Sequence, residues 1–194
     1  MKLPLVLLAA AACAACSQEP APPSPEPTAA AASATSAAPA PAAPAPPATP
    51  SPGPLALDGL GPLRIGEPVP AGSGWAEHGA QASDTCRIVT SPDYPGAYAI
   101  VEGGRVRRIS LGARSAVRLA EGFGVGATEA QVRAAFPGFR EEPHAYVAAP
   151  GKYLTAPNAA SGDPALRFEI DAGRKVSEIH VGTMPVLGYV EACS

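Results

Sequence analysis

The chain has 194 residues, a formal net charge of −3, 25 prolines and only 5% aromatic residues. Because there is no basic excess, the composition gives no electrostatic case for binding nucleic acid. We also expect no nucleotide or other cofactor, because the one glycine-rich motif lacks the strands and helices of a nucleotide site. The prolines are concentrated before residue 55, so the chain divides into an unusual leading segment and one domain-sized remainder.

The first 15 residues have the pattern of a signal peptide. Lys2 supplies a positive charge, residues 3–12 form a short apolar run, and small residues precede Cys16. A stretch of about fifteen residues is too short to cross a bilayer as a helix. The pattern therefore predicts export, with cleavage before Cys16.

The residues around Cys16 resemble the lipobox of bacterial lipoproteins, although Cys13 stands where that family usually has leucine. The resemblance implies that Cys16 receives lipid and becomes the new amino terminus. It also implies, because Ser17 follows, an outer-membrane anchor with the domain facing the periplasm. The alternatives are signal cleavage without lipidation, and exposure on the cell surface.

Residues 16–54 are predicted to hold the lipidated cysteine and a disordered linker. From Ser17 to Pro54 there are 13 prolines and 13 alanines in 38 positions, with no aromatic, leucine, isoleucine or valine side chain. Such a segment cannot offset the entropy of ordering. As extended polyproline II it would reach on the order of 100 Å.

Two cysteines, Cys86 and Cys193, remain in the predicted globular domain at 55–194. In an oxidising compartment an even pair predicts a disulfide, which here would close a loop of more than a hundred residues. Two buried thiols or a metal-binding pair are the alternatives, and two cysteines alone make a poor metal site.

An internal repeat organises the domain. Residues 97–112 and 166–182 align on Gly104-Arg105 and Gly173-Arg174, with alternating apolar residues before each turn. After each turn the apolar residues are spaced by three and then by two. This shared irregularity predicts a bulge in the return strand of each hairpin.

Each hairpin follows a similar glycine-containing segment, at 63–66 and at 123–126. Thr128 then opens a capping box that predicts a helix, ended by Pro137-Gly138, whereas the first copy has its helix absent or reduced to a turn. We also expect a hairpin from 145–147 and 153–155, and a final strand from about 186 to 192. The predicted fold class is α+β, with two related units of short helix plus antiparallel β-hairpins at about 59–113 and 120–193.

The unit of short strand, glycine, helix and hairpins resembles the small outer-membrane assembly lipoproteins, and in tandem it resembles the β-lactamase inhibitor protein fold. The carboxy-terminal segment from Gly173 to Cys193 is similar to uncharacterised bacterial lipoproteins. These resemblances imply a non-enzymatic role in contacting other proteins.

Motifs for catalysis are weak. Residues 122–127 fit G-x-G-x-x-A, but one short helix followed by hairpins is not a dinucleotide-binding unit. The histidines His78, His144 and His180 lack metal-binding spacing, so no metal site is predicted, and His180 is expected to face solvent. His144 could meet a carboxylate and a serine in space, but the chain has no G-x-S-x-G nucleophile elbow.

We therefore expect a membrane-anchored periplasmic binding or scaffolding module without catalytic residues. Its partners would be the bacterial membrane, through the lipid anchor, and an envelope protein or the cell wall. The alternatives are an inhibitor of envelope or host hydrolases and an envelope-modifying enzyme. Exposed aromatic and arginine side chains are frequent binding anchors, and the candidate surface residues are Tyr94, Trp75, Arg107, Arg108 and Tyr146.

Overall fold

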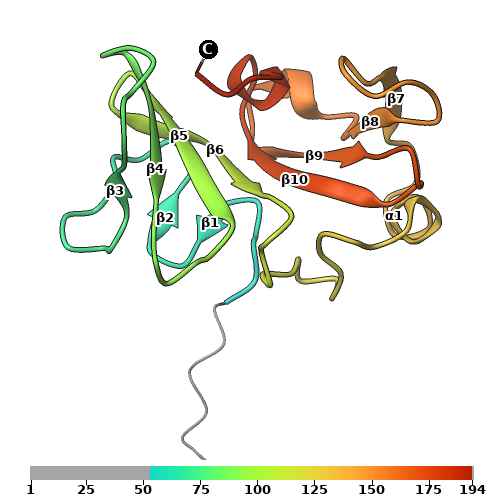
Figure 1. The fold of residues 1–194 in the computed structure, drawn as a ribbon, viewed down its shortest axis with the longest axis horizontal. Helices are drawn as coiled ribbons and strands as arrows, with labels where there is room; N and C mark the ends of the chain where they lie inside the picture. Colours follow the sequence, from blue (N-terminus) through green and yellow to red (C-terminus); the bar gives the residue numbers. More distant parts are fainter. Residues whose placement is uncertain (1–52, 194) are drawn as a thin grey trace, which may run out of the picture. The chain divides into compact units, whose positions relative to one another are not determined.

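The computed structural model describes residues 53–193, so the predicted signal peptide, the lipidation at Cys16 and the linker up to residue 52 lie outside the described residues. An eight-stranded antiparallel sheet with the strand order β3-β4-β5-β6-β10-β9-β8-β7 dominates the domain (Figure 1). Its strands are β3 (Ala76–Glu77), β4 (Cys86–Thr90), β5 (Ala97–Glu102), β6 (Arg105–Leu111), β7 (Arg140–Pro143), β8 (Lys152–Thr155), β9 (Ala165–Ile170) and β10 (Val176–Gly182).

The remaining elements are short. They are the hairpin strands β1 (Gly59–Leu60) and β2 (Leu63–Arg64), the helix α1 (Glu129–Ala135), and the 3-10 helices η1 (Ala159–Ser161) and η2 (Val186–Gly188). The fold is therefore mostly β, with one α-helix in the described part of the chain, and is only loosely α+β. No helix within residues 53–193 has the length and apolarity that a membrane span needs.

The two hairpins expected from the repeat lie at the centre of the sheet as β5–β6 and β9–β10. Each has a bulge in its return strand, with Arg107 as the extra residue of β6 and Ser177 as that of β10. The first turn needs only Gly103 and Gly104, both at positive φ, which is the backbone of a tight two-residue hairpin loop. The shared bulge predicted from residue spacing is confirmed.

The segments before the hairpins also match in their hydrogen bonds. The N–H of Gly66 donates to the Val106 carbonyl at 2.7 Å, and that of Gly126 donates to the Val176 carbonyl at 2.8 Å. Val106 and Val176 donate in return to the residue after each glycine, at 2.8 Å in both cases. The alignment of the two segments by sequence thus corresponds to the same local geometry.

The predicted helix is confirmed as α1. Thr128 is its N-cap: the Gln131 N–H donates to the Thr128 hydroxyl, and the Thr128 N–H donates to the Gln131 side chain. Val132 is buried in the core, and the helix ends just before Pro137-Gly138. The corresponding residues of the first copy, 67–75, form turns rather than a helix.

One face of the sheet packs on the main core. Alternate residues of the central strands, including Ala99, Ile109, Phe168 and Ile179, point to this side. The hairpin β1–β2, the segment at 117–119 and helix α1 cover it, contributing Leu55, Leu60, Leu63, Val117, Leu119 and Val132. In Figure 1 the cyan hairpin and α1 lie beside the first and second halves of the sheet.

Two predictions concern the carboxy-terminal segment, and the structure confirms the first but not the second. Cys86 in β4 and Cys193 form the expected disulfide, whose Cα atoms are 5.5 Å apart. The expected final strand is wrong, because residues 186–188 form η2 and the segment packs on the second face of the sheet. Its carbonyls at Val186 and Tyr189 accept hydrogen bonds from Arg108, so these groups are satisfied without a strand.

The expected hairpin around Pro150-Gly151 exists, but its first strand is β7 rather than residues 145–147. The N–H groups of Tyr146 and Val147 donate to the Nδ1 atom of His144, and that of Ala145 donates to the Tyr153 hydroxyl. The backbone N–H groups that would have paired with a neighbouring strand donate to side chains instead, so the segment forms a loop.

Candidate functional site

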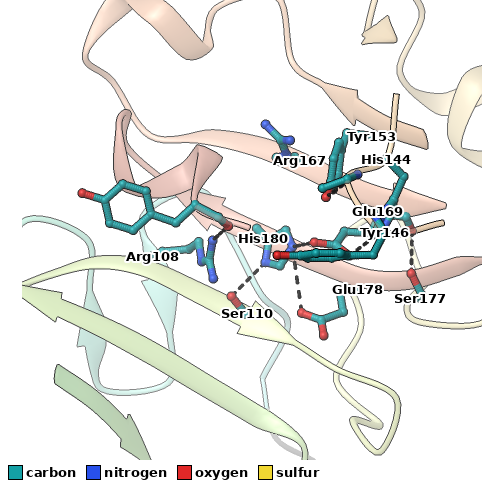
Figure 2. Close-up of polar contacts among 12 residues, drawn as sticks. Arg108, Ser110, His144, Tyr146, Tyr153, Arg167, Glu169, Ser177, Glu178 and His180 are labelled. Carbon is teal, nitrogen blue, oxygen red and sulfur yellow. Dashed lines mark hydrogen bonds and ion pairs between the residues drawn. The ribbon is translucent and has the colours of Figure 1, made fainter. Parts of the chain in front are cut away.

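The second face of the sheet carries polar side chains where its two halves meet. Ile109 and Ile179 face the core, so their neighbours Ser110 and His180 point to the opposite side. Ser110 and His180 are also direct cross-strand partners between β6 and β10. Figure 2 shows them surrounded by residues of β9, β10 and the loop that holds His144 and Tyr146.

His180 stands at the middle of this cluster and is only 2% exposed. Its Nδ1 lies 2.8 Å from the Ser110 hydroxyl, and its Nε2 lies 3.1 Å from Glu169 Oε1. Burial lowers the pKa of His180 to about 4, so the imidazole is neutral at pH 7. Since the Glu169 carboxylate can only accept, Nε2 carries the hydrogen and Ser110 donates to Nδ1.

Both carboxylate oxygens of Glu169 accept hydrogen bonds from imidazole rings. Its Oε2 lies 3.1 Å from His144 Nε2, and His144 Nδ1 accepts the N–H groups of Tyr146 and Val147. His144 therefore carries its hydrogen on Nε2 and donates it to Glu169. Burial alone would raise the pKa of Glu169, but these imidazole donors outweigh it and lower the pKa below its usual range.

Glu178 is the most accessible member of the cluster, with its side chain 35% exposed. Its Oε2 accepts a hydrogen bond from the Tyr98 hydroxyl at 3.2 Å and lies 3.9 Å from His180 Nε2. Burial raises the pKa of Glu178, and the nearby negative charge of Glu169 raises it further. The cluster thus holds two carboxylates close to each other beside a neutral imidazole.

The order of Ser110, His180 and Glu169 resembles a hydrolytic triad of hydroxyl, imidazole and carboxylate. The hydroxyl of a nucleophile must be reachable, and Ser110 is 0% exposed. A substrate carbonyl therefore has no approach to its Oγ in this conformation. His144 does meet a carboxylate, as the sequence allowed, but the serine bonds to His180 instead.

Arg108 lies inside the protein rather than on a contact surface, because it is only 1% exposed. Its guanidinium donates to the carbonyls of Tyr189, at 2.5 Å, and Val186, at 3.3 Å, and to the Tyr98 hydroxyl at 3.3 Å. The prediction that Arg108 binds a partner is thus wrong, and the side chain holds the carboxy-terminal segment on the sheet. Arg107, also predicted, is half-buried at the β6 bulge.

Trp75 and Tyr94 pack together away from this cluster. Their rings are stacked with centroids 5.5 Å apart, and Trp75 is buried in the main core. Tyr94 is half-buried and fills the space beside Gly61, where an added Cβ would lie 2.0 Å from the Tyr94 hydroxyl oxygen. Trp75 is therefore a core residue, in contrast to its prediction as a contact, and Tyr94 is largely a packing residue.

Tyr146 is the predicted residue that the structure leaves on the surface, with 66% of it exposed. Its hydroxyl donates to the carboxylate of Glu191, which joins the 144–148 loop to the carboxy-terminal segment. Between them lies a hollow of about 280 Å³. Its lining residues are Tyr146, Tyr189, Val190, Glu191 and Ala192.

Sequence reasoning missed Ser110, Glu169 and Glu178, and it expected His180 to face solvent. The signal that could have found the cluster is the repeat itself, in which His180 aligns with Ser110. Equivalent residues of two related hairpins meet where their last strands pair. An antiparallel β6–β10 pairing therefore places these two side chains together at the centre of the sheet.

No protein family model, curated protein or solved structure matches the chain.

Proposed function

We propose that this chain is a lipid-anchored binding module of a bacterial envelope, without catalytic activity. In this proposal residues 1–15 direct export, Cys16 carries the lipid, the linker provides reach, and the domain binds a partner. The signal-like amino terminus and the proline-rich segment before residue 55 support export and a tethered position at the envelope. The disulfide supports an oxidising compartment.

We further propose that the domain consists of two related units, each contributing half of the sheet. The bulges at Arg107 and Ser177 support this proposal, as do the matching hydrogen bonds of Gly66 and Gly126. Two units joined edge to edge in one sheet give a broad, rigid platform whose loops and termini can contact another protein.

The hollow beside Tyr146 is the contact surface that the geometry supports best. Four large apolar residues in the described part of the chain are exposed, namely Leu57, Tyr146, Met184 and Val190, and two of them line this hollow. The carboxy-terminal wall is held by the Cys86–Cys193 disulfide and by Arg108. A preorganised hollow with an exposed tyrosine at its rim is typical of a protein-binding site.

Crosslinking capture of envelope proteins by the full-length chain tests this surface. We expect Tyr146→Ala to weaken binding by about 2 kcal/mol, or roughly thirtyfold in Kd, as for an aromatic hot spot. Val190→Ser should also reduce recovery of the same protein. The matched control is Leu57→Ser, which removes an exposed apolar side chain outside the hollow. Equal recovery by the parent and all three variants would refute the proposed surface.

Fatty-acid labelling in cells tests the anchor. Cys16→Ser should abolish incorporation of the label and release the protein from membranes, because the acylated thiol is lost. Cys13→Ser is the matched control and should leave labelling intact. Loss of label in Cys13→Ser rather than Cys16→Ser would move the lipidation site and contradict the proposed cleavage.

An inhibitor of envelope or host hydrolases is the second candidate. The sequence resemblance to the β-lactamase inhibitor protein fold motivates it, and the two units side by side in one sheet, with four strands each, are compatible with a tandem fold. Assays of β-lactamases and lysozymes with micromolar protein separate the two functions. Inhibition that Tyr146→Ala removes would identify the hydrolase as the partner. An absence of inhibition would reject the inhibitor function and keep only the binding-module proposal.

A further inference from the structure

Three potential metal ligands meet on the second face of the sheet, beside the β6–β10 pairing. Single ligand atoms of Glu169, Glu178 and His180 all lie within 4.8 Å of one another. The His180 Nε2 atom is 3.1 Å from Glu169 Oε1 and 3.9 Å from Glu178 Oε2. A tetrahedral zinc ion with bonds of about 2.1 Å separates its ligand atoms by about 3.4 Å, so small side-chain shifts would seat an ion here.

Each of the three has the outer hydrogen-bond partner that metal ligands usually have. The second ring nitrogen of His180 meets the Ser110 hydroxyl, the second oxygen of Glu169 accepts from His144, and Glu178 accepts from the Tyr98 hydroxyl. The partners of His180 and Glu169 bond the atoms turned away from the ion position, whereas Tyr98 bonds the same Glu178 Oε2 atom that lies 3.9 Å from His180 Nε2. These hydrogen bonds orient the buried His180 and Glu169 side chains, while the more exposed Glu178 is held by Tyr98 at one oxygen.

The hydrogen positions allow His180 to bind and assign a different role to His144. The Ser110 hydroxyl can rotate and accept the His180 Nδ1 hydrogen, which frees the Nε2 lone pair for an ion. His144 cannot move its hydrogen to Nδ1, because that atom already accepts two backbone N–H groups. His144 therefore remains a donor to Glu169 and is a positioning residue.

The negative charge of the two carboxylates and their partial exposure to solvent also favour binding of a cation. Glu169 and Glu178 bring two carboxylates beside a neutral imidazole, and a divalent ion would relieve their mutual repulsion. The Glu169 side chain is 16% exposed and that of Glu178 is 35% exposed, so an ion can enter from the Glu178 side. The buried guanidinium of Arg108 donates mainly to the carbonyls of Val186 and Tyr189, at 3.3 and 2.5 Å. It reaches the site only through the Tyr98 hydroxyl at 3.3 Å, so its positive charge opposes the cation and the two carboxylates must outweigh it.

We propose that Glu169, Glu178 and His180 form a binding site for one divalent transition-metal ion of the zinc type. One imidazole and two carboxylates are nitrogen and oxygen ligands of the kind that Zn²⁺ accepts. Three protein ligands leave coordination positions for water or for a group of a partner. The site does not depend on the Tyr146 surface, so either proposal can fail without the other.

Titration of the oxidised full-length chain with Zn²⁺, followed by calorimetry, tests the site, and Co²⁺ serves as a spectroscopic probe. We expect one ion per chain and a rise in Tm on binding. Glu178→Gln keeps the volume and the acceptor for Tyr98 but removes a charged ligand, and it should weaken binding at least tenfold. The matched control Glu102→Gln alters a carboxylate that also accepts from a tyrosine, Tyr189, and should bind like the parent.

Tyr98→Phe tests the outer shell while leaving every ligand in place. It should weaken Zn²⁺ binding about 10- to 100-fold, as loss of an outer-shell donor usually does. An unchanged Tm of the metal-free variants shows that they are folded. Failure of the parent to bind at about 100 μM Zn²⁺ overturns the proposal, as does equal binding by Glu178→Gln. A cobalt–thiolate charge-transfer band would also overturn it, because it would place the ion on cysteine sulfur rather than on Glu169, Glu178 and His180.

Discussion

Glu129, the first residue of α1, shows how single charges stabilise this domain. Its buried carboxylate lies 2.8 Å from the Arg133 Nε, 3.2 Å from the Lys152 Nζ and 3.2 Å from an Arg174 guanidinium nitrogen. Burial raises the pKa of Glu129, but the hydrogen bonds from Arg133 and Lys152 outweigh it and lower the pKa below its usual range. The ionised form therefore ties α1 to the β8 strand and to the turn of the second hairpin.

We predict that Glu129→Gln costs about 1–3 kcal/mol of unfolding free energy at about pH 7, as expected for hydrogen bonds to a charged group. A lowered folded-state pKa stabilises the fold above the unfolded pKa, and this contribution is lost as pH falls through the folded value. In urea unfolding, the stability gap between parent and variant should therefore shrink as the pH falls below the usual pKa of a glutamate and through the lower folded-state pKa of Glu129. A gap that stays constant with pH, or an equal loss in the exposed control Glu121→Gln, would contradict this assignment.

At the scale of elements, the pairing of β6 with β10 joins the two halves of the sheet. Gly182 lies opposite Arg108 in this pairing, and a Cβ added at Gly182 would lie 2.2 Å from the Arg107 carbonyl oxygen. The equivalent glycine of the first copy, Gly112, has more room, because its added Cβ would come no closer than 3.5 Å to the Gly96 carbonyl oxygen. The two glycines therefore differ in the space available for a side chain, although they align in sequence.

Gly182→Ala should destabilise the domain by about 1–3 kcal/mol, since a backbone carbonyl cannot easily move aside. Gly112→Ala should cost less than about 1 kcal/mol, because its contacts are ordinary van der Waals contacts. Chemical denaturation of the two variants under one set of conditions gives the comparison. Similar losses at both positions would show that the close approach at Gly182 is relieved at little cost.

Sequence patterns predicted the elements whose structure depends on local spacing. The bulges, the capping box at Thr128 and the two central hairpins all follow from residues close together in the chain. The patterns failed where a distant side chain satisfied the backbone, as Arg108 does for the carbonyls of Val186 and Tyr189. Apolar residues near 186–192 therefore looked like a strand but form a turn of 3-10 helix.

The candidate site could not be predicted from the sequence because it also depends on contacts between residues that are far apart in the chain. Glu169, Glu178 and His180 have no recognisable metal-binding spacing, and their outer partners Tyr98, Ser110 and His144 come from three other parts of the chain. Charge and composition cannot report which polar residues lie under a covering segment. Alternation in β10 correctly places Glu178 and His180 on the same face, but not whether solvent reaches that face.

At the scale of the whole molecule, the Cys86–Cys193 disulfide joins the carboxy-terminal segment to β4 across 107 residues. Removing it should cost up to about 4.7 kcal/mol in the loop-entropy description, although losses of 2–5 kcal/mol are typical. Cys193→Ser with Cys86→Ser, compared with the oxidised parent in urea, measures the loss. Unchanged stability would mean that Arg108 and η2 hold the segment without help from the covalent bond.

We propose that the whole domain serves to bind an envelope protein through the hollow beside Tyr146. The most direct measurement places a photoreactive phenylalanine analogue at position 146 of the full-length chain, irradiates living cells and identifies the adducts. We expect one specific protein adduct from position 146 and none from the analogue at the exposed control position 57. Adducts of equal yield and identity from both positions, or no protein adduct from position 146, would contradict it.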